Sequence, residues 1–296
     1  MFWDTKMKEL FQLIGFILLP LLVGGIIRKT RSRAQNRKGP SITQVLRDIY
    51  RNLQKQAVVS SQPGFFIEYA PMIAIMGSLI AWSIVAFEWT SFVFIVFFLV
   101  LERVALTGFA SENGTSFGGM GSSRETLLSI STEPTLLLMI LVAQSHIQMD
   151  ASITSFSMGA LFLVACFYAV LVELSKPPFD DPRTHLELTM VHEAMLLEAS
   201  GRKFAMFEIS YQIKSATMLT LLVKLGLEHT KFHKNDYLSP SWIPFWVIPA
   251  VLLSAVGLGI WEAFCARRKW SWVPELMGLI FLVILFLGTL VKLHDI

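Results

Sequence analysis

The sequence predicts an all-α fold: a polytopic membrane helix bundle with about eight transmembrane helices and additional amphipathic cytoplasmic helices. Three observations predict it. Of the 296 residues, 54% are hydrophobic and only 16% are charged, whereas soluble domains carry about 25% charged residues. The mean hydropathy is +0.57. The apolar residues come in runs near the ~20 residues that a helix needs to cross a ~30 Å hydrocarbon layer. We therefore expect a single integral membrane domain over residues 1–296.

Eight apolar runs are expected to span the bilayer, and each must be helical because lipid offers the backbone no hydrogen-bond partners. They are Leu10–Ile27, Tyr69–Phe87, Trp89–Ala110, Pro134–Met149, Phe156–Ser175, Ala205–Glu228, Trp242–Ala266 and Trp272–Leu293. The fourth run is short and the sixth carries Glu208 and Lys214, so these two fit the spanning pattern least well. Tryptophans lie at several run ends, as an interfacial aromatic belt requires.

Lysine and arginine set the expected orientation. Residues 28–55 carry nine basic side chains and one acidic one, Asp48, and a second basic group, Arg267 to Lys269, lies between the last two runs. Loops rich in Lys and Arg stay in the cytoplasm. With eight spans both loops share that face, so both termini are expected outside the cell's inner (cytoplasmic) membrane.

The segments between the spans have structure of their own. Ser41–Val59 has apolar residues at helical spacing, which predicts an amphipathic helix at the membrane surface. Asn113–Gly121 predicts a flexible loop, and Ser122–Glu125 a capping box that begins the next helix. The prolines of Lys176–Pro182 exclude a helix there, whereas Arg183–Ala199 predicts one.

The segment after these prolines contains the first candidate site. Glu187 and Glu198 are eleven residues apart, so on a helix they share a face about 16 Å apart. Such carboxylates can point into the bundle, or they can be ordinary carboxylates of a solvated amphipathic helix. A zinc protease is excluded because Leu196 occupies the position of the second histidine after His192. Neither cysteine lies in a metal-binding pattern.

Ionisable residues inside the apolar runs are further candidates, because they are costly in lipid and usually face a cavity or a partner. Glu102 and Arg103 interrupt the third run, and Glu208 lies in the sixth. Snorkelling to the membrane surface is the alternative for each of them. Three more charged residues, Arg124, Glu125 and Glu133, surround the start of the fourth run. They fit either a proton path or a salt bridge that fixes a loop.

Three motifs carry a family resemblance: Arg37–Pro40 (RKGP), Phe117–Glu125 (FGGMGSSRE) and Asp180–Met195 (DDPRTHLELTMVHEAM), the last followed by Glu198–Gly201 (EASG). The chain resembles subunit 1 of respiratory complex I. It resembles more closely the hydrogenase-like branch of that family, which includes formate hydrogenlyase subunit 4 and the membrane subunit of group 4 membrane-bound hydrogenases. The likeness runs in order along nearly the whole chain, and THLELTM-x-HEAM is typical of the hydrogenase branch.

The resemblance implies a non-catalytic subunit of an oxidoreductase complex. Such a subunit docks a peripheral iron–sulfur arm onto the membrane arm and couples its electron transfer to proton or sodium translocation. The implied partners are iron–sulfur and hydrogenase-like subunits, antiporter-like membrane subunits and the lipid bilayer, with no nucleic acid. No cofactor is implied in this chain. Iron–sulfur clusters, and a nickel–iron centre in relatives that keep it, belong to the partner subunits.

The resemblance also assigns residues. It makes Glu187 and Glu198 relay carboxylates, and Glu102, Glu125, Glu133 and Glu208 are candidates for the same proton relay. The expected docking loop contains Asp180, Asp181, His185 and Glu193, with Arg124 at the same entrance. Lys176 replaces the arginine that the family usually has and loses a bidentate carboxylate contact. This departure argues against quinone binding.

Two other functions remain as alternatives. The first is the quinone-site subunit of NADH:quinone oxidoreductase, against which the hydrogenase-type motif argues. The second is a stand-alone ion transporter. Transporters often show paired half-repeats with broken helices, and the two halves of this sequence show no such symmetry.

Overall fold

The computed structural model describes residues 2–56, 58, 64–144, 153–180, 190–229, 243–266, 268 and 272–294, and these contain helices and irregular segments but no strand. The helices are α1 (Phe2–Ala34), α2 (Gln44–Gln54), α3 (Phe65–Phe87), α4 (Val93–Glu112), α5 (Ser116–Gln144), α6 (Ile153–Glu173), α7 (His192–Met195), α8 (Gly201–His229), α9 (Ile243–Phe264) and α10 (Trp272–His294). The all-α bundle predicted from the sequence is confirmed.

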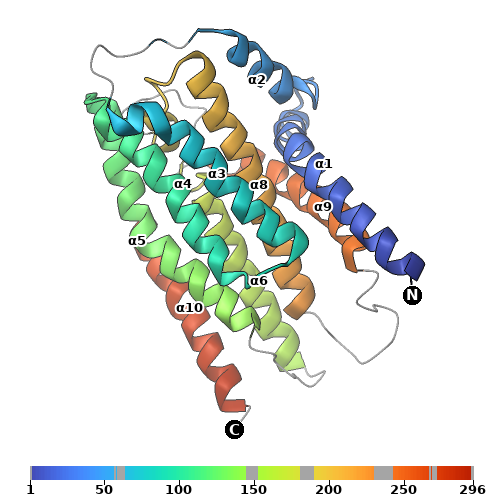
Figure 1. The fold of residues 1–296 in the computed structure, drawn as a ribbon. Helices are drawn as coiled ribbons and strands as arrows, with labels where there is room; N and C mark the ends of the chain where they lie inside the picture. The colour runs from blue at the N-terminus through green and yellow to red at the C-terminus, as the bar shows by residue number, and fades with distance from the viewer. Residues whose placement is uncertain are drawn as a thin grey trace.

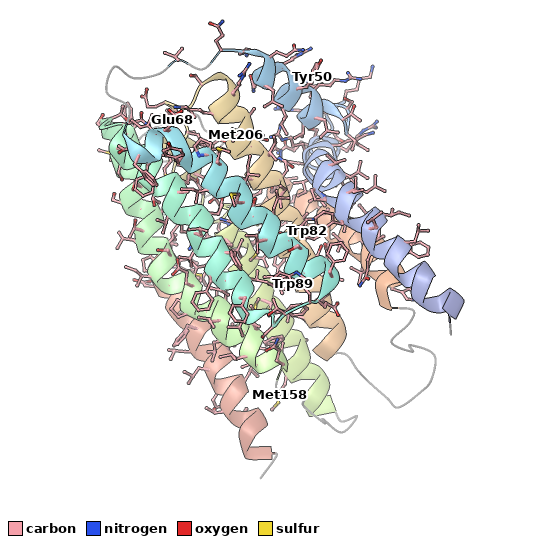
Figure 2. The ribbon with its side chains drawn as sticks, in the orientation of Figure 1. Tyr50, Glu68, Trp82, Trp89, Met158 and Met206 are labelled. Carbon is pink, nitrogen blue, oxygen red and sulfur yellow. The ribbon has the colours of Figure 1, made fainter. Side chains whose placement is uncertain are left out.

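The long helices lie alongside one another in a single bundle, with α2 and the start of α8 at one end (Figure 1). We call this the α2 end. The opposite end, where α1 begins and α10 ends, is the far end. In Figure 2, Tyr50 and Glu68 lie at the α2 end, whereas Trp89 and Met158 lie at the far end. Helix α8 packs against α1, α2, α3, α6 and α9, so it holds a central position.

Six of the described helices are long and apolar enough to cross a membrane: α1, α3, α4, α5, α9 and α10. The apolar part of α6, Met158–Glu173, is shorter. Helix α8 is long but carries Glu208, Lys214 and Lys224. The predicted number of about eight spans is therefore not confirmed. Of the two runs that fit the pattern least well, the sixth lies in α8, outside the six, whereas the fourth overlaps α5, which is one of them.

The glycine-rich segment is helical from Ser116 on, so the prediction of a loop that extends to Gly121 and of a capping box at Ser122–Glu125 is wrong, whereas residues 113–115 lie outside the helices. Helix α5 begins at Ser116, and Pro134 lies inside it. Gly121 is buried, and a Cβ atom at this position would lie 2.9 Å from the carbonyl oxygen of Val191. The glycine thus allows the segment around α7 to approach α5 closely, which is a packing role and not a hinge.

The two predicted surface helices have different outcomes. Helix α2 lies inside the predicted Ser41–Val59 helix and buries Val45 and Ile49, which confirms its amphipathic character. The predicted Arg183–Ala199 helix is wrong in its described part, where only α7 is helical. Here the carboxylate of Asp180 accepts hydrogen bonds from the backbone N–H groups of Val191 and His192, both at 3.1 Å. These bonds fold the chain back onto the proline turn instead of continuing a helix.

Candidate functional site

Six charged side chains from four helices meet inside the bundle, and we call them the central cluster. They are Glu102 and Arg103 of α4, Glu125 and Glu133 of α5, Glu173 of α6 and Lys214 of α8. All except Glu133 are buried. Two of these helices, α4 and α5, are long and apolar enough to cross a membrane, so the cluster lies at a place where charge is tolerated only if it is paired.

Arg103 holds three carboxylates with three different nitrogen atoms. Its Nε lies 2.9 Å from Glu125 Oε1 and its Nη1 lies 3.0 Å from Glu133 Oε1. Its Nη2 donates to Glu173 Oε2. A planar guanidinium with donors along both edges suits this arrangement, and a lysine ammonium could not reproduce it.

Lys214 continues the chain of ion pairs toward α4. Its Nζ lies 2.9 Å from Glu102 Oε2 and 3.0 Å from Glu173 Oε1. Glu173 therefore bridges the two cations. Counting formal charges, four carboxylates face two cations, so the cluster is two negative charges from neutrality when every carboxylate is ionised. The uptake of two protons would make the cluster formally neutral.

A second set of charges, the α2-end network, lies nearer the end of α1. Arg28 pairs with Glu208 at 2.9 Å, and Gln212 donates to the same carboxylate at 3.0 Å. The carboxylate of Glu262 on α9 binds Arg31 at 3.1 Å and Lys176 at 2.8 Å. These pairs join α1, α8, α9 and the proline turn.

Lys176 stands in the proline turn, outside the helices. Burial alone would lower the pKa of its ammonium, but the Glu262 carboxylate and the Tyr211 hydroxyl beside it outweigh burial and hold this pKa above its ordinary value. The turn itself is fixed to α9, because the indole N–H of Trp261 donates to the Pro177 carbonyl at 2.9 Å. Lys176 therefore remains a fixed positive charge at physiological pH.

A polar cavity of about 270 Å³ lies between these networks and α7. Its lining includes Arg28, Lys176, His192, Glu193, Glu208 and Ser215. The ring of His192 lies over Tyr211, with centroids 5.1 Å apart. The lining also includes Leu174 and Ser215, which directly follow Glu173 and Lys214 in the sequence, but none of the six side chains of the central cluster.

The structure brings some of the predicted relay residues together and separates others. Glu102, Glu125 and Glu133 belong to the central cluster, Glu208 belongs to the α2-end network, and Glu198 is exposed at the α2 end. Glu187 lies outside the described residues. None of these positions by itself tests the relay role, which stays a prediction.

The predicted docking residues also lie in different parts of the structure. Asp180 is fully buried and braces the backbone before α7, so its carboxylate faces inward. Glu193 lines the cavity, and Arg124 is partly buried on α5. Asp181 and His185 lie outside the described residues. Because its carboxylate is buried, Asp180 would contribute to docking by fixing the conformation of the loop and not by contacting a partner.

Three charged residues of these networks were not assigned a role from the sequence: Glu173, Glu262 and Lys214. Each lies within one of the predicted apolar runs. Because an unpaired charge is costly in lipid, a charged residue in such a run is the sequence feature that could have identified them. Their partners are far away in sequence, however, so the pairing itself could not be read from the chain.

Comparison with known families decides the assignment. Residues 7–293 match the model of the NADH dehydrogenase family. The chain belongs to this family. The resemblance to its hydrogenase-like branch is confirmed as well, because the relatives include subunits named for hydrogenase and formate hydrogenlyase.

This member of the NADH dehydrogenase family is 30% identical to hydrogenase-4 component C of Escherichia coli K12 over 236 residues, which cover 74% of each chain. It is 28% identical to formate hydrogenlyase subunit 4 of the same organism over 234 residues, covering 71% of this chain and 74% of the relative. It is 26% identical to NADH-ubiquinone oxidoreductase chain 1 of Triticum aestivum over 244 residues, covering 70% and 72%.

Among solved structures, a chain of the membrane-bound sulfane sulfur reductase, an archaeal respiratory membrane complex, superposes with a TM-score of 0.73. The overlap covers 96% of this chain and 99% of that one at 14% identity. At this identity the match establishes a shared fold. The six apolar helices and the relatives from membrane complexes identify a multi-pass membrane protein.

Proposed function

We propose that this chain is the membrane-arm docking and coupling subunit of a complex I-like redox complex of the hydrogenase type. It links electron transfer in a peripheral iron–sulfur arm to the translocation of protons or sodium ions. The observation that carries the proposal is the central cluster, in which ion pairs connect four helices inside the bundle. The names of the family relatives supply the redox context.

The cluster has the features of a relay. Glu125 keeps one oxygen, Oε2, buried without a hydrogen-bond partner among the described residues, so it offers an acceptor for an incoming proton. Arg103 and Lys214 share Glu173, so a charge that arrives on one side changes the electrostatic energy of the other. A change of charge in the cavity at the α2 end would thereby shift protons among the carboxylates of the cluster.

In this proposal the peripheral arm docks at the α2 end. The segments around α2 and α7 lie there, and the basic residues within 28–55 support a cytoplasmic location for this end by the positive-inside rule. Both termini then lie outside the inner membrane. Asp181, His185, Glu187 and Glu198 would act in or beside the docking loop, with Glu187 and Glu198 as the first carboxylates of the relay.

The redox centres of the proposed complex would be held by its peripheral subunits. We propose iron–sulfur clusters there, with a nickel–iron centre if the hydrogenase chemistry is retained, and antiporter-like subunits as neighbours in the membrane. Quinone has no assigned role. Lys176, where the family usually has arginine, is already engaged by Glu262, and the cavity beside it is lined largely by polar and charged side chains.

Purification from native membranes in a mild detergent tests the proposal. Iron–sulfur subunits, antiporter-like subunits and iron, with or without nickel, should co-purify with the chain. Nickel would assign hydrogenase chemistry, and iron alone would assign a different reaction at the dock. A chain that purifies alone would overturn the proposal and favour a stand-alone transporter. Bound quinone would instead favour a quinone-site subunit of the NADH:quinone oxidoreductase type.

A further inference from the structure

Helix α8 carries a stripe of polar side chains along its buried length. The stripe consists of Ser210, Lys214, Thr217, Thr220 and Lys224, and each is at most 7% exposed. Their spacing of four, three, three and four residues keeps them on one face of a helix. Buried polar groups in a membrane bundle are costly and usually mark an ion pathway. The central cluster accounts only for Lys214.

The stripe faces α3 and α4. Ser210 donates to the carbonyl oxygen of Ala74 at 3.0 Å, and Lys214 pairs with Glu102. Ten residues further along, the Lys224 ammonium donates to the carbonyl oxygen of Val85 and to the Glu88 carboxylate. Lys214 and Lys224 are about 15 Å apart along the helix axis. The stripe thus leads from the central cluster toward the far end.

Thr220 lies between the two lysines, one turn before Lys224. Its side-chain hydroxyl is buried and makes no hydrogen bond among the described residues. By contrast, the hydroxyl of Thr217 donates to the carbonyl of Ile213 at 2.9 Å. A buried hydroxyl without a partner is costly, and a water molecule is the usual way in which proteins satisfy such a group. This points to hydration within the stripe.

The far end of the stripe opens to solvent through Glu88. This residue caps α3 in the left-handed conformation, and its side chain is 48% exposed. Lys224 itself is only 7% exposed and lies 5.8 Å from the ring centroid of Phe92. A lysine that merely anchored α8 in the headgroup region would extend its ammonium into water. Here the ammonium is enclosed and its partner carboxylate meets the water.

We propose that this stripe is a hydrated proton path within the chain, from the central cluster to the far face. Lys224 is the last buried carrier and Glu88 is the outlet. In each cycle the Lys224 ammonium transfers a proton to the Glu88 carboxylate, which releases it to water. The neutral amine then regains a proton from Lys214 along water held at Thr220. One proton enters from the cluster for each one that leaves, and no electron is transferred.

The path rests on the proposed coupling function, since it gives the protons of the central cluster an exit in this subunit. The first test uses the whole purified complex in proteoliposomes loaded with the pH dye pyranine. Reduced methyl viologen is the electron donor, and protons or polysulfide are offered as acceptor. Uncoupler-sensitive proton movement is compared for the wild type, Lys224→Met and Thr220→Val. Ser254→Ala on α9 is the control, because the Ser254 hydroxyl donates to the Val251 carbonyl of its own helix and to no other group among the described residues.

We expect Lys224→Met to slow proton movement roughly 100-fold, the lower end of what a positioned proton donor contributes, while viologen oxidation continues. Thr220→Val should act in the same direction and Ser254→Ala should not. Normal proton movement in an assembled Lys224→Met complex overturns the path. If Glu173→Gln abolishes proton movement while Lys224→Met does not, the proposed function stands and only the exit is wrong. If neither variant has an effect, both are wrong.

A second test needs no redox substrate. Thr220→Cys and Leu219→Cys are made in a chain whose two native cysteines are replaced by alanine, and membrane vesicles are treated with methanethiosulfonate ethylsulfonate. Leu219 is the matched control, because it is equally buried on the neighbouring position of α8. Hydration of the stripe predicts ~10-fold faster labelling at 220, since only a hydrated thiol ionises and reacts. Equal, slow labelling at both positions would overturn a water-filled path.

Discussion

Replacing Arg103 by leucine is expected to be the most destabilising single change in the central cluster. The substitution removes the cation that holds Glu125, Glu133 and Glu173, and it leaves three carboxylates facing one another in the bundle. Removing one partner of a buried ion pair costs about 3–5 kcal/mol, because the remaining charge is left uncompensated. Arg103→Lys should fall between the wild type and Arg103→Leu, since one ammonium cannot serve three carboxylates.

An ion pair with a solvent-exposed carboxylate provides the control. Lys203 lies 3.6 Å from Glu68, whose side chain is 56% exposed, and such pairs contribute at most about 1 kcal/mol. The expected difference between Arg103→Leu and Glu68→Gln is therefore at least ~2 kcal/mol. For a chain of this size, that corresponds to a difference of roughly 3 °C or more in the unfolding midpoint.

Heating detergent extracts of the membranes and measuring the epitope-tagged chain that stays soluble gives the midpoint without isolating the subunit. The order expected is wild type, then Glu68→Gln, then Arg103→Lys, then Arg103→Leu as the least stable. An Arg103→Leu midpoint equal to that of Glu68→Gln would refute the reasoning. It would mean that the cluster is hydrated or that its carboxylates are already protonated.

Three further predictions concern Asp180, Lys176 and Glu187. Asp180→Ala should expose the α7 segment to limited proteolysis, because it removes two hydrogen bonds to a charged acceptor worth about 1.5–3 kcal/mol each; an unchanged cleavage pattern would contradict this. Lys176→Gln should lower the unfolding midpoint equally at about pH 6 and about pH 9. Because the pKa of Lys176 is raised in the folded protein, its contribution to stability is complete below the unfolded lysine pKa of ~10.4 and is lost only as pH rises through the folded pKa. A loss of stability in Lys176→Gln that disappears by pH 9 would contradict this prediction. Glu187→Gln should abolish ion coupling while the complex still assembles, and normal ion pumping would remove Glu187 from the relay.

The sequence predicts the architecture well because bilayer physics acts on whole segments. Runs of about 20 apolar residues must be helical in lipid, and six of the eight predicted runs correspond to helices that meet this criterion. It fails where tertiary packing decides. The packing role of Gly121 becomes visible only when α5 and the α7 segment are placed side by side. The inward-facing carboxylate of Asp180 likewise becomes visible only when its backbone partners are known.

The candidate site was also only partly predictable from the sequence. Glu102 and Arg103 are recognisable in the sequence because charge is rare in an apolar run, and the cost of burying it implies partners. Which partners are chosen depends on how helices distant in the chain pack together. Arg103 lies 70 residues from Glu173, and Lys214 lies 112 residues from Glu102. Helical periodicity, which relates residues three or four apart, carries no information about such pairs.

The number of ions moved per electron pair in the Glu173→Gln complex tests the central claim most directly. Glutamine keeps the shape of the side chain and removes the charge that Arg103 and Lys214 share. Ion uptake into proteoliposomes is compared with viologen oxidation, with Glu68→Gln as the control. The account predicts continued electron transfer with ion movement lost in Glu173→Gln alone. An assembled Glu173→Gln complex that moves as many ions per electron pair as the wild type would contradict it.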